Sequence, residues 1–254
     1  MAKFIKPKNT SWGGVAKWYD EYLGDEDTYQ EKVILPNLLR VLSLKKGDRV
    51  VDIACGQGYF ADRLEKAGAE MVGADISEEL ITIAKRRFPK IQFYVAPAGK
   101  LSFAKSGGFE VAMIVLAIQN IADIRGAFAE AARVLCPGGR LVLVMNHPAF
   151  RIPRRSSWGW DEEHKIQYRR MDGYLSERSA PIIAHPGKKE SESTLSYHRS
   201  LQDFFKALSK NGFLIARLEE WISHKQSEKG PRQKAENIAR TEFPLFLMLE
   251  AKKF

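Results

Sequence analysis

The chain has 254 residues, of which 44% are hydrophobic and 28% charged, with a formal net charge of +9. This length fits one large domain or one domain with an inserted cap, and the hydrophobic content excludes global disorder. The two cysteines, Cys55 and Cys136, are too few for a disulfide framework, and no apolar run is long enough for a membrane span or a signal peptide. We therefore expect a cytoplasmic protein without a transmembrane segment.

The basic excess is concentrated in three segments, residues 1–11, 151–190 and 224–240, each with a formal charge of +3. Positive segments beside a pocket favour an anionic substrate, a membrane surface or RNA. A solvated surface explains the same charge equally well. Charge alone therefore leaves the partner open.

The first half of the chain alternates apolar runs with helical patterns. Residues 12–44 have apolar side chains at helical spacing and predict one or two helices. After them, the patterns predict strands at 49–54, 71–75, 91–95, 109–117 and 140–145, and helices at 59–67, 78–88 and 124–135. The near-continuous apolar run 109–117 is typical of a central parallel strand covered on both faces.

The second half departs from this alternation. Residues 147–196, rich in proline, aromatic residues and charge, predict an inserted cap, followed by a helix at 201–210 and strands at 213–221 and 243–251. The fold class is therefore α/β: a Rossmann-like, seven-stranded, mostly parallel sheet with helices on both faces and an antiparallel last strand. We expect four units: a helical lid (1–44), a cofactor-binding core (45–146), the substrate cap (147–196) and the completion of the sheet (197–254).

The stretch Asp52-Ile53-Ala54-Cys55-Gly56-Gln57-Gly58 follows the first apolar strand and precedes a helix. Glycines at such a turn leave backbone N–H groups accessible, and an acidic residue at the end of the next strand, here Asp75, can accept both hydroxyls of a ribose. The spacing lacks the third glycine of a dinucleotide fingerprint and the Gly-Lys-Ser/Thr of a phosphate loop. A carboxylate at Asp52 repels phosphate and attracts a cation.

With these residues the sequence resembles the class I S-adenosylmethionine-dependent methyltransferases, especially the branch that methylates quinones and small molecules. The resemblance covers residues 12–146 best. It implies S-adenosyl-L-methionine as the cofactor, S-adenosyl-L-homocysteine as the product, and no metal. It also implies a cofactor-binding set: Trp12, Tyr29, Asp52, Ala54, Gly56, Gly58, Asp75, Ile76, Ala98 and Leu116. The family's acidic adenine contact is missing, because Ala96-Pro97-Ala98 occupies its place.

The acceptor side is read from residues that follow the strand at 140–145. His147 is the candidate general base, because a neutral imidazole can take a hydroxyl proton near pH 7. A turn histidine bound to backbone is the alternative. Substrate contacts are expected from the lid and the cap, where aromatic residues alternate with arginines: Tyr19, Asn146, Phe150, Arg151, Trp158 and Tyr168.

The sequence therefore predicts a methyltransferase that acts on a small, aromatic or anionic acceptor by O- or C-methylation. The amino-directed motif Asn/Asp-Pro-Pro-Tyr/Phe is absent after the fourth strand, where Ala117-Ile118-Gln119-Asn120 stands. An RNA or protein methyltransferase that docks through the basic cap is one alternative, and a non-catalytic S-adenosylmethionine-binding protein is another. The oligomeric state is left open.

Overall fold

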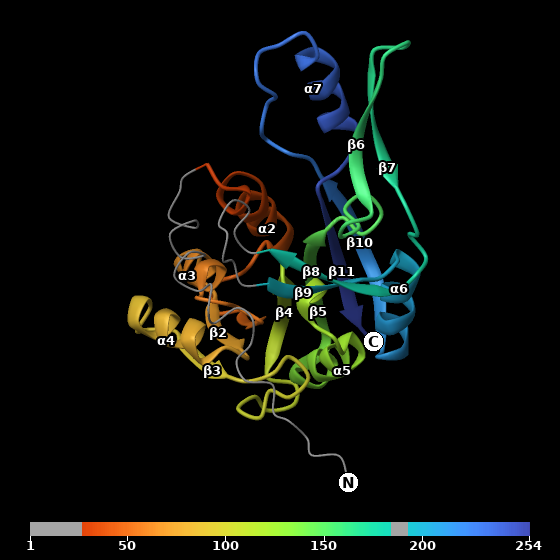
Figure 1. The fold of residues 1–254 in the computed structure, drawn as a ribbon. Helices are drawn as coiled ribbons and strands as arrows, with labels where there is room; N and C mark the ends of the chain where they lie inside the picture. Colours follow the sequence, from red (N-terminus) through yellow and green to blue (C-terminus); the bar gives the residue numbers. More distant parts are fainter. Residues whose placement is uncertain (1–26, 184–192) are drawn as a thin grey trace.

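The computed structural model describes residues 27–183 and 193–254, and their core is a seven-stranded sheet (Figure 1). The strand order is β10-β11-β5-β4-β1-β2-β3. The strands are β1 (Arg49–Ile53), β2 (Glu70–Asp75), β3 (Gln92–Val95), β4 (Phe109–Val115), β5 (Leu135–Asn146), β10 (Phe213–Trp221) and β11 (Phe246–Lys253).

Helices cover both faces of this sheet because successive strand residues point to opposite sides. In β1, Val50 belongs to the core under α2 (Leu35–Leu42), α3 (Tyr59–Lys66) and α4 (Glu78–Arg87), whereas Val51 belongs to the core under α5 (Ile124–Val134) and α6 (Leu201–Lys210). Both valines are fully buried. The sheet is thus the middle layer of a three-layer α/β fold.

The strand directions confirm the predicted fold class. β1 pairs in parallel with β2 and β4, and the parallel pairing continues outward to β3 and β5. β11 runs antiparallel to both β5 and β10. All the parallel strands therefore end at one edge, which is where ligands bind in such sheets.

Residues 147–196 form two antiparallel hairpins in their described part. The first pairs β6 (Ser156–Asp161) with β7 (Ile166–Met171), and the second pairs β8 (Arg178–Ile183) with β9 (Ser193–His198). The first hairpin extends beyond the sheet at the top of Figure 1.

A helix that the sequence patterns did not predict, α7 (Gln233–Glu242), lies beside this first hairpin (Figure 1). Arg232, at its start, forms an ion pair with Glu162 at 2.5 Å, and its guanidinium lies 4.5 Å from the centre of the Trp160 ring. The cap region therefore includes a helix from the C-terminal part of the chain. The division into four units remains a prediction.

Two searches of the described residues gave negative results. None of the helices in 27–183 and 193–254 combines the length and the apolar character needed to cross a membrane. Within the same residues, no group of three or more histidine, cysteine, aspartate or glutamate side chains is placed to hold a metal ion.

Candidate active site

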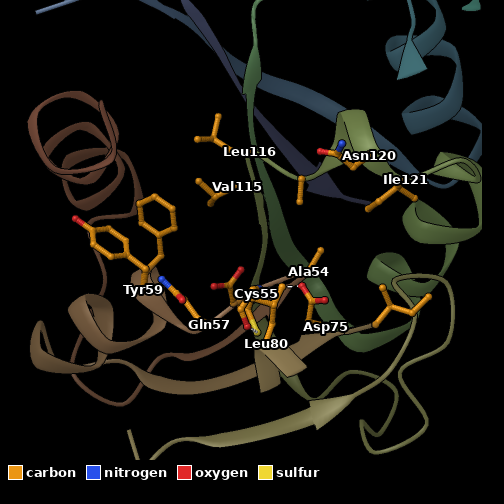
Figure 2. A pocket seen from close by; sticks show the side chains of 15 residues that line it. Ala54, Cys55, Gln57, Tyr59, Asp75, Leu80, Val115, Leu116, Asn120 and Ile121 are labelled. Atoms are coloured by element: carbon orange, nitrogen blue, oxygen red, sulfur yellow. Dashed lines mark hydrogen bonds between the residues drawn. The ribbon is translucent and has the colours of Figure 1, made fainter. Parts of the chain in front are cut away.

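A hollow of about 800 Å³, which includes space open to solvent, lies at the carboxyl ends of β1, β2 and β4 (Figure 2). Its lining comes from the bend after β1, the end of β2 and the segment after β4: Asp52, Ala54, Cys55, Gly56, Gln57, Tyr59, Phe60, Asp75, Ile76, Leu80, Val115, Leu116, Ala117, Asn120 and Ile121. We call it the donor hollow.

The bend after β1 depends on left-handed backbone conformations. Ala54, Gly56 and Gly58 have φ values of 60°, 58° and 81°. A Cβ on Gly56 would meet no atom within 4 Å, so the bend is open at this point, whereas a Cβ on Gly58 would lie 2.7 Å from the Phe93 ring. Gly56 therefore leaves room for a ligand, and Gly58 lets the bend pack on β3.

Asp75 holds the bend in place from the next strand. Its Oδ2 accepts a hydrogen bond from the Gly56 N–H at 2.9 Å, and its Oδ1 accepts one from the Ser77 N–H at 2.8 Å. Burial raises the pKa of this carboxyl group, and the backbone hydrogen bonds oppose that shift. A carboxylate has about four acceptor positions, so each oxygen can accept one further hydrogen bond from a ligand.

Two acceptor oxygens at the bend have no hydrogen-bond partner among the described residues. They are Oδ2 of Asp52, a residue that is 1% exposed, and Oε1 of Gln57, which is 2% exposed. Burial, and secondly the charge of Asp75, raise the pKa of the Asp52 carboxyl well above its usual range. Among the described residues that line the hollow there is no lysine, arginine or histidine. Unpaired acceptors without a protein cation suit a positively charged ligand that donates hydrogen bonds.

The opposite wall of the donor hollow is apolar. Leu116 has a φ of 55°, and its N–H donates to the Val144 carbonyl at the end of β5. Ile76 directly follows Asp75 and is 56% exposed. In Figure 2, Val115 and Leu116 face the bend across the hollow. An apolar, flat part of a ligand fits between such walls.

Six of the predicted cofactor residues meet in this hollow: Asp52, Ala54, Gly56, Asp75, Ile76 and Leu116. Sequence reasoning missed Gln57, Tyr59, Leu80 and Asn120. The first three lie within or next to the motifs around Asp52 and Asp75, so their proximity was a usable signal. Asn120 follows β4 in the short helix η3 (Ile118–Asn120), so its place just after a predicted strand was its signal.

Three predicted cofactor residues lie elsewhere, and Trp12 and Tyr19 are outside the described residues. Gly58 does not line the hollow, for the packing reason given above. Ala98 packs against the core under α5 and α6. Tyr29 packs edge-on against Phe246 and His224, and its hydroxyl lies 3.2 Å from Ser223 Oγ.

The structure contradicts the expectation that His147 faces an acceptor. The side chain is 2% exposed, its Nε2 donates to Glu220 Oε1 at 2.8 Å, and its Nδ1 accepts from the Ala149 N–H at 3.2 Å. Both ring nitrogens are therefore occupied, and burial lowers the imidazole pKa. His147 fixes the chain after β5 and is not retained as a base.

The predicted acceptor residues separate into different surroundings. Phe150, Arg151 and Trp158 line a second hollow, while Asn146 lines a smaller third one that Arg151 shares. Tyr168 is 47% exposed, and its ring covers Gly159 on the facing strand of the β6–β7 hairpin, where a Cβ would lie 2.3 Å away. The structure therefore brings three of these residues together.

Comparison with known proteins finds methyltransferases. Residues 51–143 match the model of a methyltransferase domain. The demethylmenaquinone methyltransferase of Paenarthrobacter aurescens is 35% identical over 114 residues, 44% of this chain and 45% of that protein. The enzyme of the same name from Thermus thermophilus is 38% identical over 141 residues, 53% of this chain and 61% of that protein. The chain thus spans about half the length of the curated relatives it matches.

Among solved structures, the S-adenosylmethionine dependent methyltransferase from Mesorhizobium loti has a TM-score of 0.67 at 27% identity, over 85% of this chain and 96% of that one. Sheet order, site and matches together show that the chain carries a methyltransferase domain of the class I, S-adenosylmethionine-dependent type. Its similarity is to the quinone-methylating branch.

Proposed function

We propose that the protein transfers a methyl group from S-adenosylmethionine to a small, aromatic or anionic acceptor, at oxygen or carbon. The carrying observation concerns the described residues: acceptor oxygens of Asp52 and Gln57 lack a partner among them, and none of those that line the hollow has a cationic side chain. An ammonium group supplies three hydrogen-bond donors and a positive charge, which is the complement of this pair.

The other residues of the hollow suit the rest of the cofactor. Asp75 retains acceptor positions for two ribose hydroxyls beyond its bonds to Gly56 and Ser77. The exposed face of Ile76, with Leu80 beside it, offers an apolar surface for adenine. A pyrophosphate would meet two carboxylates and no cation, so the same hollow disfavours a dinucleotide.

When bound, S-adenosylmethionine supplies a methyl group on a positively charged sulfur. The chain's part is then to align the acceptor with that group and to exclude water. No proton acceptor is assigned, since His147 is enclosed. An acceptor that is already ionised, or that reacts at carbon, needs none.

The relatives support a small-molecule acceptor, because their name specifies a demethylmenaquinone, a quinone-type compound. The segment after β4 also lacks the amino-directed motif, and Ile118–Asn120 forms a short helical turn there. Both points favour O- or C-methylation over N-methylation.

A radiolabel transfer assay tests the proposal. The purified chain, with labelled S-adenosylmethionine, is offered a panel of quinols, phenols and aromatic acids, and separately RNA and protein. Label on a small molecule supports the proposal. Label on RNA or protein alone would contradict the proposal and favour an RNA or protein methyltransferase that docks through the basic cap. Cofactor binding without transfer to any of these acceptors would favour a non-catalytic binding protein.

A further inference from the structure

The second hollow lies at the same edge of the sheet as the donor hollow. It encloses about 440 Å³, including space open to solvent, and is lined by Tyr29, Phe150, Arg151, Trp158, Arg169, Ser223, Arg240, Phe243, Pro244 and Leu245. We call it the arginine hollow. Its lining comes from the chain after β5, the β6–β7 hairpin, the end of α7 and the residues that precede η2 (Gln30–Ile34) and β11.

The two hollows are neighbours through the end of β5. Leu116 of the donor hollow donates its N–H to the Val144 carbonyl at 2.7 Å. Three residues after Val144, the His147 N–H donates at 3.0 Å to the carbonyl of Leu245, which lines the arginine hollow. Backbone hydrogen bonds through the end of β5 thus connect a lining residue of one hollow to a lining residue of the other.

The arginine hollow has the opposite charge to the donor hollow. Three arginines line it, Arg151, Arg169 and Arg240, and the described part of its lining contains no aspartate or glutamate. None of the three has an ion pair within the described residues, whereas Arg40, Arg49 and Arg133 each pair with a glutamate at 2.5–2.6 Å. Unneutralised guanidinium groups that converge from separate elements are typical of an oxyanion site.

Two of these arginines are held in position by other groups. Arg169 donates from Nε to the Phe150 carbonyl and from Nη2 to Ser156 Oγ, both at 2.9 Å, and its guanidinium lies 4.9 Å from the centre of the Trp158 ring. Arg240 donates from Nε to Ser227 Oγ at 3.0 Å. Burial lowers the pKa of Arg169, and the nearby charge of Arg151 lowers it further. An anion bound between them would relieve this repulsion.

The remaining wall is aromatic. The Phe243 ring packs edge-to-face against Phe150, with ring centres 5.6 Å apart, and against Trp158, at 5.5 Å. Trp158 is 40% exposed although it lies in this hollow. Aromatic rings that are partly open to solvent offer stacking surfaces to a flat ligand.

We propose that the arginine hollow binds an aromatic molecule that carries a carboxylate or phosphate group. The oxyanion is held by Arg151 with Arg240 and Arg169, and the ring packs among Phe150, Trp158 and Phe243. That this hollow binds such a molecule does not depend on the proposed function. That the bound molecule is also the methyl acceptor does rest on the proposed function.

Titration calorimetry with benzoate and phenyl phosphate tests this site, with benzamide and acetate as controls that lack the charge or the ring. We expect at least one aromatic anion to bind the wild-type chain and both controls to bind at least tenfold more weakly. Arg151→Gln and Arg240→Gln should each weaken the anion about tenfold or more, because a hydrogen bond to a charged group is lost. Arg155→Gln, an exposed arginine of the same segment that lines no hollow described here, should leave the affinity unchanged.

Three results would overturn the site: no binding of either aromatic anion, equal binding of benzamide, or equal weakening by Arg155→Gln and Arg151→Gln. Circular dichroism confirms that each variant is folded, since all three positions are at least partly exposed. S-adenosylmethionine is titrated into the same samples. Donor binding without anion binding contradicts the arginine hollow alone, and anion binding without donor binding contradicts the proposed function alone.

Discussion

The carboxylate of Asp75, at the end of β2, accepts a hydrogen bond from the backbone N–H of Gly56, in the bend after β1, at 2.9 Å. The two residues come from neighbouring parallel strands, in which Asp52 is paired with Gly73. The acid that the family resemblance assigns to the ribose therefore also fixes the loop that faces the amino-acid end of the cofactor. One side chain links the two halves of the proposed donor site.

Asp52→Asn should separate these two halves. It removes the charge opposite the ammonium group, so affinity for S-adenosylmethionine should fall about ten- to hundredfold, the value of a hydrogen bond between charged groups. Affinity for 5′-methylthioadenosine, which lacks the amino-acid group, should not change. Asp75→Asn is the matched variant and should weaken both ligands in calorimetry. Equal weakening of both by Asp52→Asn would contradict the assignment.

Donor binding should release protons. The pKa of Asp52 is raised in the free protein by burial and by Asp75, and a bound cation favours the ionised form. Affinity should therefore rise with pH until Asp52 is ionised in the free protein. Calorimetry in two buffers of different ionisation enthalpy measures the released protons, and the Asp52→Asn variant should release fewer. Identical proton release by the wild type and the Asp52→Asn variant would show that the protons do not come from Asp52.

The same carboxyl group should destabilise the free protein at neutral pH. For an acid whose pKa is raised on folding, the contribution to stability is fully present below the unfolded pKa and is lost as pH rises through the folded pKa. Asp52→Asn should thus raise the thermal midpoint at pH 7 and make it less dependent on pH. A lower midpoint than that of the wild type would show that the carboxylate stabilises the bend instead.

Substitution by alanine should affect mainly stability at Gly73 and mainly affinity for S-adenosylmethionine at Gly56. In Gly73→Ala the new Cβ lies 2.5 Å from the Phe93 ring and 2.9 Å from Cys55 Sγ, so unfolding free energy should fall by about 1–3 kcal/mol. In Gly56→Ala no atom lies within 4 Å of the Cβ. The unfolding free energy should then fall by only about 1–2 kcal/mol, which is what a left-handed backbone conformation costs an alanine. The new methyl group projects into open space at the bend. The affinity for S-adenosylmethionine should fall in the Gly56→Ala variant and should be unchanged in the Gly73→Ala variant where that variant is folded. Unchanged affinity in the Gly56→Ala variant would argue against a contact between the ligand and Gly56.

His147→Gln should affect stability and not proton transfer. Burial lowers the pKa of His147 from 6.5, so its contribution to stability is present above that pH and is lost as pH falls through the folded value. The difference in unfolding free energy between wild type and variant should shrink as the pH is lowered. The pH profile of turnover should keep its shape, and loss of an ionisation from that profile would restore His147 as a base.

The donor site could be predicted largely from the sequence because its parts lie within single strand-to-helix connections. Asp52, Gly56 and Asp75 follow directly from where β1 and β2 end, and parallel strands bring those ends together. Ala98 and His147 do not line the donor hollow, because their positions depend on how a loop folds back. His147 is fixed by Glu220, 73 residues away.

The arginine hollow was harder to predict because distant segments build it. The sequence marked Phe150, Arg151 and Trp158 in the cap, but gave no sign that Arg240 and Phe243 join them. Helix α7, which precedes Phe243, is mostly polar and has a single buried residue, Ala239. Tyr29, predicted to contact the cofactor, lines the arginine hollow, and its hydroxyl partner, Ser223, is 194 residues away.

The most direct measurement is calorimetric titration of the purified chain with S-adenosylmethionine, S-adenosylhomocysteine and a nicotinamide dinucleotide. The two carboxylates and two unpaired acceptor oxygens of the donor hollow predict binding of the first two and none of the dinucleotide. Binding of the dinucleotide, with neither S-adenosyl compound bound, would contradict the account.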